Sequence, residues 1–175
     1  SMEELMQMLE DGELDTVLSY RPSRHFDNIE SHILFNSNLC VIARRDHPLA
    51  GKDKVRLVDL EKFPMALPSR GLQARNEFDR LLFGQNYRFD VRLEVNDLNM
   101  LLDLVSRTDM ITFLSAATVK DNPEFCTIDI DHNETEMVGS YHLLKGQYIK
   151  VATRAFLKSL IENNAFMISM ETLTA

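Results

Sequence analysis

The residues best suited to bind a ligand are Ser69, Arg70 and Gly71, which stand between a short apolar stretch ended by Pro68 and a predicted helix. Free N–H groups at such a junction, together with a hydroxyl and a guanidinium group, can hold an anion. The alternative is that Ser69 caps the helix and Arg70 points to solvent. On residue types alone the capping interpretation is the commoner one, so both interpretations stay open.

Three other strand ends carry candidate ligand-binding side chains. They are Tyr20 with Arg21, Asn96 with Asp97, and Phe113 with Ser115. A serine hydroxyl both donates and accepts hydrogen bonds, so Ser115 is the better candidate of its pair, whereas core packing explains Phe113 more simply. Ser115 could equally cap a short helix that follows it, and Asn96 or Asp97 could cap a helix over 98–105.

His47 is the residue that most invites a catalytic interpretation. It immediately precedes Pro48, which holds it extended within a turn. No serine or cysteine nucleophile motif accompanies it, and the chain has neither a phosphate-binding glycine loop nor a G-x-S-x-G sequence. We therefore expect a structural role for His47, no enzymatic activity and no cofactor.

Two segments have residue types that could bind a metal ion, but their spacing argues against it. The first contains His25, Asp27, Glu30 and His32. Their spacing matches none of the usual zinc patterns. The second begins at Asp129 like a calcium-binding loop, but Glu134 stands where that loop needs glycine and Ser140 where it needs glutamate. We therefore expect no metal site.

The composition is that of a soluble globular protein without a DNA-binding or membrane-spanning part. The chain has 175 residues, of which 45% are hydrophobic and 26% charged, and its net charge is −8, whereas a duplex-binding module would present a basic face. No apolar run approaches the roughly 18 residues of a membrane span. The acidic start Ser1–Glu4 is unlike a signal peptide. Cys40 and Cys126 lack a spacing motif, as expected of reduced thiols in the cytoplasm.

Helical and strand patterns alternate along the chain, which predicts an α/β protein with mainly parallel sheets. Helices are expected over 5–9, 57–60, 74–82, 98–105, 116–119 and from 153 onward, and Gly12 is expected to end the first of them. Strands are expected over 16–20, 33–35, 39–43, 65–67, 91–95, 110–114, 125–130 and 137–144. The second and third strands are predicted to be joined by a polar turn at 36–38.

Several of these segments, in this order, resemble the effector-binding domain of LysR-type transcriptional regulators. The matching segments are Gly12–Asp15, Leu39–Ala50 with its His-Pro-Leu-Ala end, Val58–Leu60, Met65–Gly71, Glu94–Asp97 followed by Leu101–Val105, and Ala155–Leu157. Each motif is weak alone, whereas the ordered set spans nearly all of the chain and is specific.

The resemblance implies the two-lobed, type 2 periplasmic-binding-protein-like fold. One lobe would comprise residues 1–67 plus 135–175 and the other residues 68–134, together forming one effector-binding domain. We expect the DNA-binding domain of the family to be absent from this chain. The family's domain opens with one more strand, so we expect this one to be N-terminally truncated and part of the ligand cleft to be missing. Ser115 stands where the family usually has proline.

The function implied by the resemblance is ligand sensing and oligomerisation within a bacterial transcription factor. Such domains form homodimers or tetramers, and a small-molecule effector favours one relative arrangement of the lobes. Arg21 and Arg70 suggest that the effector is an anion. The alternative is a solute-binding protein of a transporter with the same fold, against which the missing signal peptide argues. An enzyme on a two-lobed fold is a third interpretation, which no nucleophile and base support.

Overall fold

The computed structural model describes residues 2–20 and 25–162, which form two compact units. Unit 1 contains the described residues up to Asn36 and those from Met137 onward, and unit 2 contains Ser37–Glu136. The chain therefore passes from one compact unit to the other at 36/37, and not near residue 67 as the resemblance suggested. The chain returns to unit 1 at 136/137.

The passage at 36/37 lies within a single long strand, β2 (Ile29–Arg44), which belongs to both units. The predicted turn at 36–38 is wrong, because Asn36, Ser37 and Asn38 continue the extended backbone of β2. Polar residues flanked by two apolar runs are typical of a hairpin turn. Here the same pattern marks the place where one strand leaves the core of unit 1 and enters that of unit 2.

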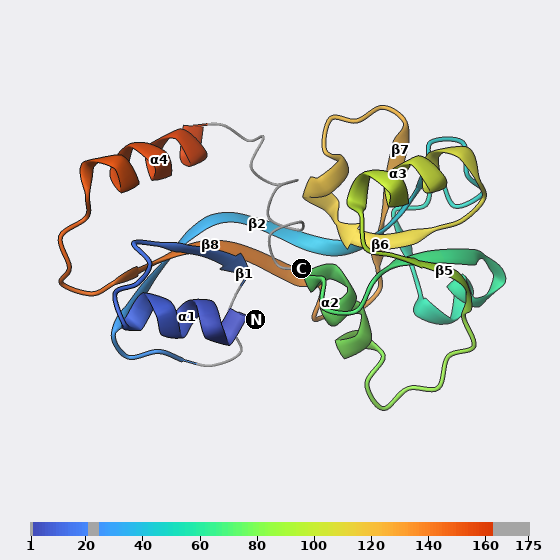
Figure 1. Ribbon diagram of the computed structural model, residues 1–175. Helices are drawn as coiled ribbons and strands as arrows, with labels where there is room; N and C mark the ends of the chain where they lie inside the picture. Colours follow the sequence, from blue (N-terminus) through green and yellow to red (C-terminus); the bar gives the residue numbers. More distant parts are fainter. Residues whose placement is uncertain (1, 21–24, 163–175) are drawn as a thin grey trace. The chain divides into compact units, whose positions relative to one another are not determined.

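Unit 2 is built from short strands and helices that follow β2 (Figure 1). They are β3 (Lys54–Val55), the 3-10 helix η1 (Leu57–Lys62), β4 (Pro64–Pro68), α2 (Gln73–Leu81), β5 (Asp90–Val95), α3 (Leu98–Arg107), β6 (Thr112–Ser115), the 3-10 helix η2 (Ala116–Val119) and β7 (Phe125–Ile130). Helix α2 packs against β4 and β6, and α3 packs against β4 and β5. The expected helices and strands of this unit are thus present, with small shifts at their ends.

The strands of unit 2 that are linked by helices are parallel. Strand β4 pairs with β5 in parallel, and a parallel bridge joins Met65 of β4 to Ile111 at the start of β6. Strand β3 is parallel to β7. The exception is β2, which is antiparallel to both β6 and β7. The sheet is therefore mixed rather than mainly parallel, because β2 arrives from unit 1 instead of through a crossover helix.

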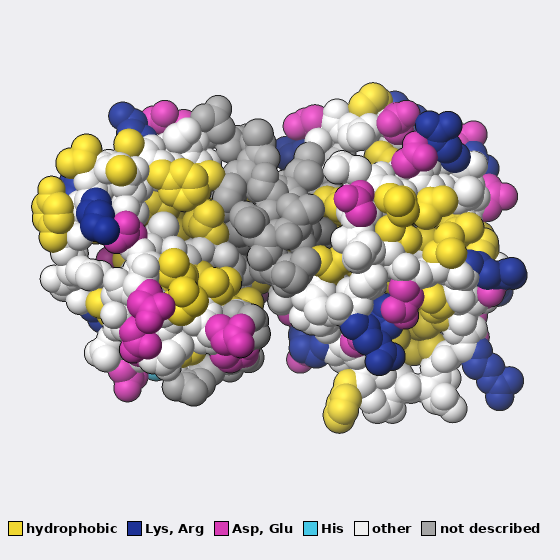
Figure 2. Space-filling view, viewed as in Figure 1, with side chains coloured by type: hydrophobic (Ala, Val, Ile, Leu, Met, Phe, Trp, Pro, Cys, Tyr) yellow, Lys and Arg dark blue, Asp and Glu magenta, His cyan; other side chains and the backbone are white. Residues whose placement is uncertain are grey.

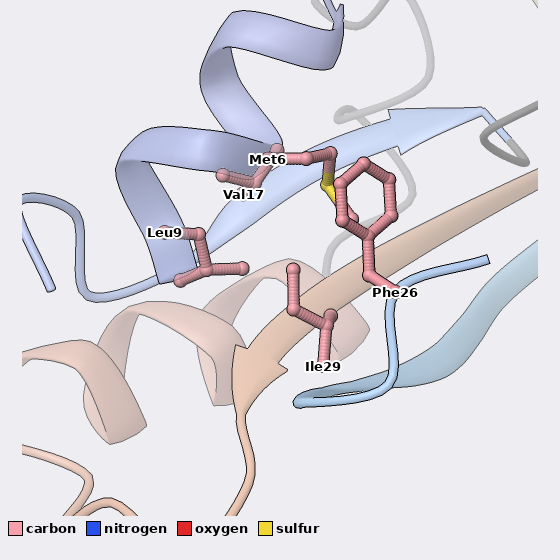
Figure 3. Packing of buried hydrophobic residues seen from close by; sticks show 5 residues of the cluster. All are labelled: Met6, Leu9, Val17, Phe26 and Ile29. Atoms are coloured by element: carbon pink, nitrogen blue, oxygen red, sulfur yellow. The ribbon is translucent and has the colours of Figure 1, made fainter. Parts of the chain in front are cut away.

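Unit 1 contains α1 (Met2–Glu10), β1 (Val17–Tyr20), the first part of β2, β8 (Glu136–Leu144) and α4 (Val151–Glu162). Strand β8 lies between β1 and β2, and β1 is antiparallel to it. Met6 and Leu9 of α1 pack with Val17, Phe26 and Ile29 in the core (Figure 3). Helix α1 ends before Gly12, whose φ of +73° confirms the predicted helix end.

Gly139 of β8 lies against the ring of Phe35, and a Cβ atom at this position would overlap that ring. We expect Gly139→Ala to lower the free energy of unfolding by about 1–3 kcal/mol, the usual cost of overpacking. Urea unfolding monitored by circular dichroism measures the change. In a Phe35→Leu background the same substitution should cost clearly less, and an equal cost in both backgrounds would contradict this explanation.

Candidate functional site

The strand register brings three of the predicted site residues to one edge of unit 2. Pro68 at the end of β4 pairs with Val95 at the end of β5, so Ser69 and Asn96 leave their strands side by side. Met65 pairs with Ile111, so the end of β6 at Ser115 reaches the same edge. Ligands of open α/β sheets bind outside the carboxyl ends of parallel strands. We call this region, containing Ser69, Asn96 and Ser115, the carboxyl edge.

A tight turn follows β4 at the carboxyl edge. The amide of Ser69 donates to the carbonyl of Val95 (2.9 Å) and the amide of Leu72 donates to the carbonyl of Ser69 (3.2 Å). Gly71 has a φ of +98°, which a side chain would oppose and which a turn of this kind requires. Helix α2 begins only at Gln73, and its N-cap residue is Leu72 without a side-chain cap. The capping interpretation of Ser69 is therefore wrong.

The side chains of this turn have no partner within the part of the chain that the structure describes. No hydrogen bond or ion pair is found there for the Ser69 hydroxyl or for the Arg70 guanidinium, and Arg70 is exposed while Ser69 is half-buried. An arginine without a carboxylate partner beside a free hydroxyl can bind a carboxylate or phosphate group. These two side chains therefore form the part of the carboxyl edge that is best suited to an anion.

Arg75 is a second cation near the carboxyl edge, and it was not predicted from the sequence. Its side chain is only 6% exposed and donates to the carbonyl of Pro68 (3.1 Å) and to the carboxylates of Asp79 (2.8 Å) and Glu94 (3.0 Å). Burial opposes its charge, but hydrogen bonds to the two carboxylates outweigh burial and raise the pKa of Arg75. Arg75 is thus neutralised within unit 2 and fixes the end of β4 to α2 and β5.

Asn96 and Asp97 have separate roles. The carboxylate of Asp97 accepts a hydrogen bond from the amide of Met100 (2.8 Å), which confirms it as the N-cap of α3. Asn96 is exposed, and its side chain has no partner among the described residues. Its amide group is therefore available at the carboxyl edge, beside the turn at Ser69.

The sequence suggested that Ser115 caps η2, but its side chain makes no capping hydrogen bond there. The side chain is 1% exposed and its hydroxyl donates to the Oγ atom of Ser37 (2.9 Å). The same Ser37 oxygen accepts the amide of Ala117 (3.2 Å), so Ser37 of β2 caps the first turn of η2 in place of Ser115. Ser37 was not singled out from the sequence, because its partners lie 78 and 80 residues away.

Phe113 lies in the core of unit 2. Its side chain is fully buried, and its ring stacks on that of Phe78 with 4.0 Å between the ring centroids. A residue enclosed in this way presents no surface to a ligand in this structure. The core-packing interpretation of Phe113 is therefore the one that the structure supports.

The remaining predicted residues, Tyr20 and Arg21, belong to unit 1. Tyr20 is buried at the end of β1, and its ring meets the ring of Phe35 edge-on at 5.9 Å. Arg21 lies outside the described residues. Tyr20 therefore serves the core of unit 1, and the structure does not place Arg21.

His47 has the structural role expected of it. Its Nδ1 atom accepts the amide of Leu49 (3.1 Å), so its Nε2–H donates to the carbonyl of Asp109 (3.1 Å). Burial lowers the pKa of His47, which favours this neutral form. The ring joins the turn after β2 to the loop before β6.

The other chemical possibilities raised by the sequence have simple structural explanations. His25 lies 3.4 Å from Asp27, and His32 lies 3.4 Å from Glu30, as two separate pairs. Within the described ranges, no group of three or more acidic, histidine or cysteine side chains could hold a metal ion. Cys40 and Cys126 are both free thiols. No helix in the described part is long and apolar enough to cross a bilayer.

Two further surface features of the protein bear on what it could bind. A hollow of about 520 Å³ beside η2 is lined by ten residues: Arg45, Ala116, Val119, Lys120, Asp121, Asn122, Pro123, Phe125, Cys126 and Thr127. It is open to solvent, and its walls carry charges of both signs.

On the face shown in Figure 2, basic and acidic side chains are intermixed rather than gathered into one basic area. This face therefore lacks the charge pattern of a duplex-binding surface.

Comparison with proteins of known sequence identifies the family. The sequence profile of the LysR substrate binding domain matches residues 1–165. The RuBisCO operon transcriptional regulator of Allochromatium vinosum is 31% identical over 97 residues, which are 54% of this chain and 32% of that protein. The chain thus spans about a third of the length of this curated relative.

Solved structures agree with the family match. The regulatory domain of Synechocystis PCC6803 CcmR in complex with 2-PG has a TM-score of 0.73 and 25% identity, covering 94% of this chain and 80% of that one. The effector binding domain of QuiR in complex with shikimate has a TM-score of 0.66 and 21% identity, covering 93% and 77%. Full-length CbnR complexed with its target DNA has a TM-score of 0.68 and 18% identity, covering 94% and 57%.

The type 2 periplasmic-binding-protein-like fold expected from the sequence is the fold of these neighbours. Because the family match covers residues 1–165 of the 175, the chain belongs to the substrate-binding, or effector-binding, domains of LysR-type transcriptional regulators.

Proposed function

We propose that this domain senses a small anionic effector and that the effector binds at the carboxyl edge of unit 2. The observation that carries the proposal is the exposed guanidinium of Arg70, which has no partner among the described residues and adjoins the equally unpartnered hydroxyl of Ser69. The amide of Asn96 stands at the next strand end, where the register places it beside Ser69. Together they offer a cation and neutral donors for a carboxylate or phosphate group.

The relatives support this choice of ligand class. Among the solved neighbours, the CcmR domain is in complex with 2-PG and the QuiR domain is in complex with shikimate. Both compounds are anions at neutral pH. The CcmR domain is also the most informative of the neighbours discussed, because its 25% identity accompanies a TM-score of 0.73. We therefore take 2-PG as the first probe and shikimate as the second.

The biological role that follows is regulation of transcription rather than catalysis. Effector binding would shift the population of two conformations of the regulator, by no more than the difference in its affinity for them. The change would reach DNA through a DNA-binding domain carried by the full-length protein, in homodimers or tetramers in the cytoplasm. The relative from Allochromatium vinosum is a transcriptional regulator, which favours this role over solute transport.

Replacing Arg70 tests the proposal directly. Because a hydrogen bond to a charged group contributes about 1.5–3 kcal/mol, we expect Arg70→Ala to weaken 2-PG binding by about 10–150-fold. Isothermal titration calorimetry of 2-PG and shikimate with the 175-residue chain measures the change. Arg107→Ala is the matched control, since Arg107 is exposed on α3 and paired with Asp103. Unchanged affinity in Arg70→Ala would remove Arg70 from the site.

A further inference from the structure

We propose that the Oγ–H group of Ser37 donates a hydrogen bond to an acidic effector at the carboxyl edge. The inference rests on the proposed function and adds a binding residue to it. Ser37 belongs to β2, the strand that runs from unit 1 into unit 2, and the sequence placed it only in a predicted turn, not among the candidate site residues. Its position and its hydrogen bonds both point to this role.

The position of Ser37 follows from the strand register. Leu39 of β2 pairs with Ser115, the last residue of β6, and the two strands are antiparallel. Ser37 precedes Leu39 by two residues, so it lies just past the end of β6, where its oxygen meets the amide of Ala117. Along the carboxyl edge, the strand order therefore gives Asn96 from β5, Ser69 from β4, Ser115 from β6 and Ser37 from β2.

The hydrogen bonds of Ser37 leave its hydroxyl proton without a partner among the described residues. A serine hydroxyl can accept two hydrogen bonds and donate one. The Ser37 oxygen already accepts the hydroxyl of Ser115 at 2.9 Å and the amide of Ala117 at 3.2 Å. Its acceptor capacity is thus used, while no acceptor for its own proton is found within the described ranges. The group that Ser37 can still offer is a donor.

This arrangement selects the chemistry of the ligand. A hydroxyl whose oxygen accepts two hydrogen bonds is a better donor, because hydrogen bonds in a chain polarise one another. Ser37 is half-buried, and the two hydrogen bonds that its oxygen accepts hold the hydroxyl in place. Its partner must be an acceptor, such as a carboxylate or phosphate oxygen. An ammonium group would find no free lone pair there.

Ser115 has a positioning role in this scheme. Ser115 is 1% exposed and its hydroxyl proton is donated to Ser37, so it has no donor left to offer a ligand. Together with the amide of Ala117 it fixes the Ser37 oxygen. The sequence suggested that the hydroxyl of Ser115 binds the effector. In this proposal the hydroxyl of Ser37 in β2 does so instead.

The test is a pair of variants that keep the two accepted hydrogen bonds and differ in the donor. Asn and Asp both place an oxygen where Ser115 and Ala117 can donate to it, and both are good N-cap residues. Ser37→Asn retains an N–H donor, whereas Ser37→Asp has none and carries a negative charge. Ser106→Ala is the control, because the Ser106 hydroxyl donates only to the carbonyl of Asp103 within α3. Thermal unfolding of each variant reports the structural role separately.

Binding of 2-PG, shikimate and inorganic phosphate to the 175-residue chain is measured by calorimetry. We expect Ser37→Asp to melt near the wild-type temperature and to lose about thirtyfold or more in affinity, from a lost charged hydrogen bond and added repulsion. Ser37→Asn and Ser106→Ala should stay within about threefold of the wild type. Wild-type affinity in Ser37→Asp would overturn the role of Ser37 and leave the proposed function standing. A wild-type chain that binds none of the three anions would instead overturn the proposed function and this inference with it.

Discussion

Phe113→Ala is expected to lower the free energy of unfolding by about 3–5 kcal/mol, which is the usual cost of removing a buried aromatic ring. Phe113 is fully buried in β6, and its ring stacks on Phe78 at 4.0 Å with 28° between the ring planes. The substitution leaves a cavity between β6 and α2, which the rigid sheet can fill only in part. Urea unfolding monitored by circular dichroism measures the loss.

Phe83→Ala is the matched control for this prediction. Phe83 follows α2 and is 88% exposed, so its removal should change the stability by less than about 0.5 kcal/mol. A ligand contact at Phe113 would give a different result. In that case Phe113→Ala would unfold at a nearly unchanged urea concentration and would lose affinity for 2-PG.

Local sequence signals predicted the elements of this domain well. Asp97 is the N-cap of α3 because a short carboxylate before an apolar stripe is a local pattern, complete within four residues. Gly12 is also a local signal, because a glycine just after a helical stripe readily adopts the positive φ that ends α1. The turn predicted at 36–38 failed because the same polar residues also suit an extended strand. Whether β2 bends there or continues depends on the strands that pair with it, which are far away in the sequence.

The candidate site was predicted only in part, because the missing information is long-range. Ser69 and Arg70 became candidates because of their place between a strand and a helix. Ser37 and Arg75 were not, since the first is defined by contacts with Ser115 and Ala117, and the second by its burial beneath the end of β4. The one local signal for Arg75 was Asp79 four residues later, and that spacing is common on exposed helix surfaces.

The two serines at residues 37 and 115 show how such errors arise. Ser115 is a plausible cap when its own neighbourhood is considered alone, whereas Ser37 stands in a strand and has no helix beside it in the sequence. The structure decides between them by the register of β2 against β6, which places the oxygen of Ser37 next to the amide of Ala117. The hydroxyl of Ser115 then becomes a donor to Ser37. A pairing of two strands thus assigns both roles at once.

His142 of unit 1 is expected to make the stability of the protein depend on pH. Its side chain is fully buried in β8, between Ser19 (2.9 Å from Nε2) and Ser31 (2.7 Å from Nδ1). The Ser19 hydroxyl donates to the carbonyl of Tyr20, so its oxygen accepts Nε2–H, and Ser31 donates to Nδ1. The bond from Ser31 requires an unprotonated Nδ1 atom and therefore the neutral ring. Burial, together with the nearby His32, lowers the pKa of His142 to about 4.

The sign of the pH effect follows from this depressed pKa. In the unfolded chain a histidine titrates near its ordinary value of about 6.5, so below that pH the unfolded state binds a proton that the folded state does not. The contribution of His142 to the free energy of unfolding is therefore fully present above pH 7. It falls by about 3 kcal/mol in total as the pH decreases from about 6.5 to about 4. Below that range the contribution is constant, because both states are protonated.

His142→Gln isolates this contribution, because glutamine retains a donor and an acceptor but does not titrate. Urea unfolding at a series of pH values from 7.5 to about 4.5 should show a steeper loss of stability in the wild type than in the variant, by up to about 1.4 kcal/mol per pH unit. All other titrating groups, His47 and the carboxylates included, are common to both proteins and cancel in the difference. Parallel stability curves for the two proteins would mean that His142 titrates equally in the folded and unfolded states. The hydrogen bond from Ser31 would then not hold the ring neutral.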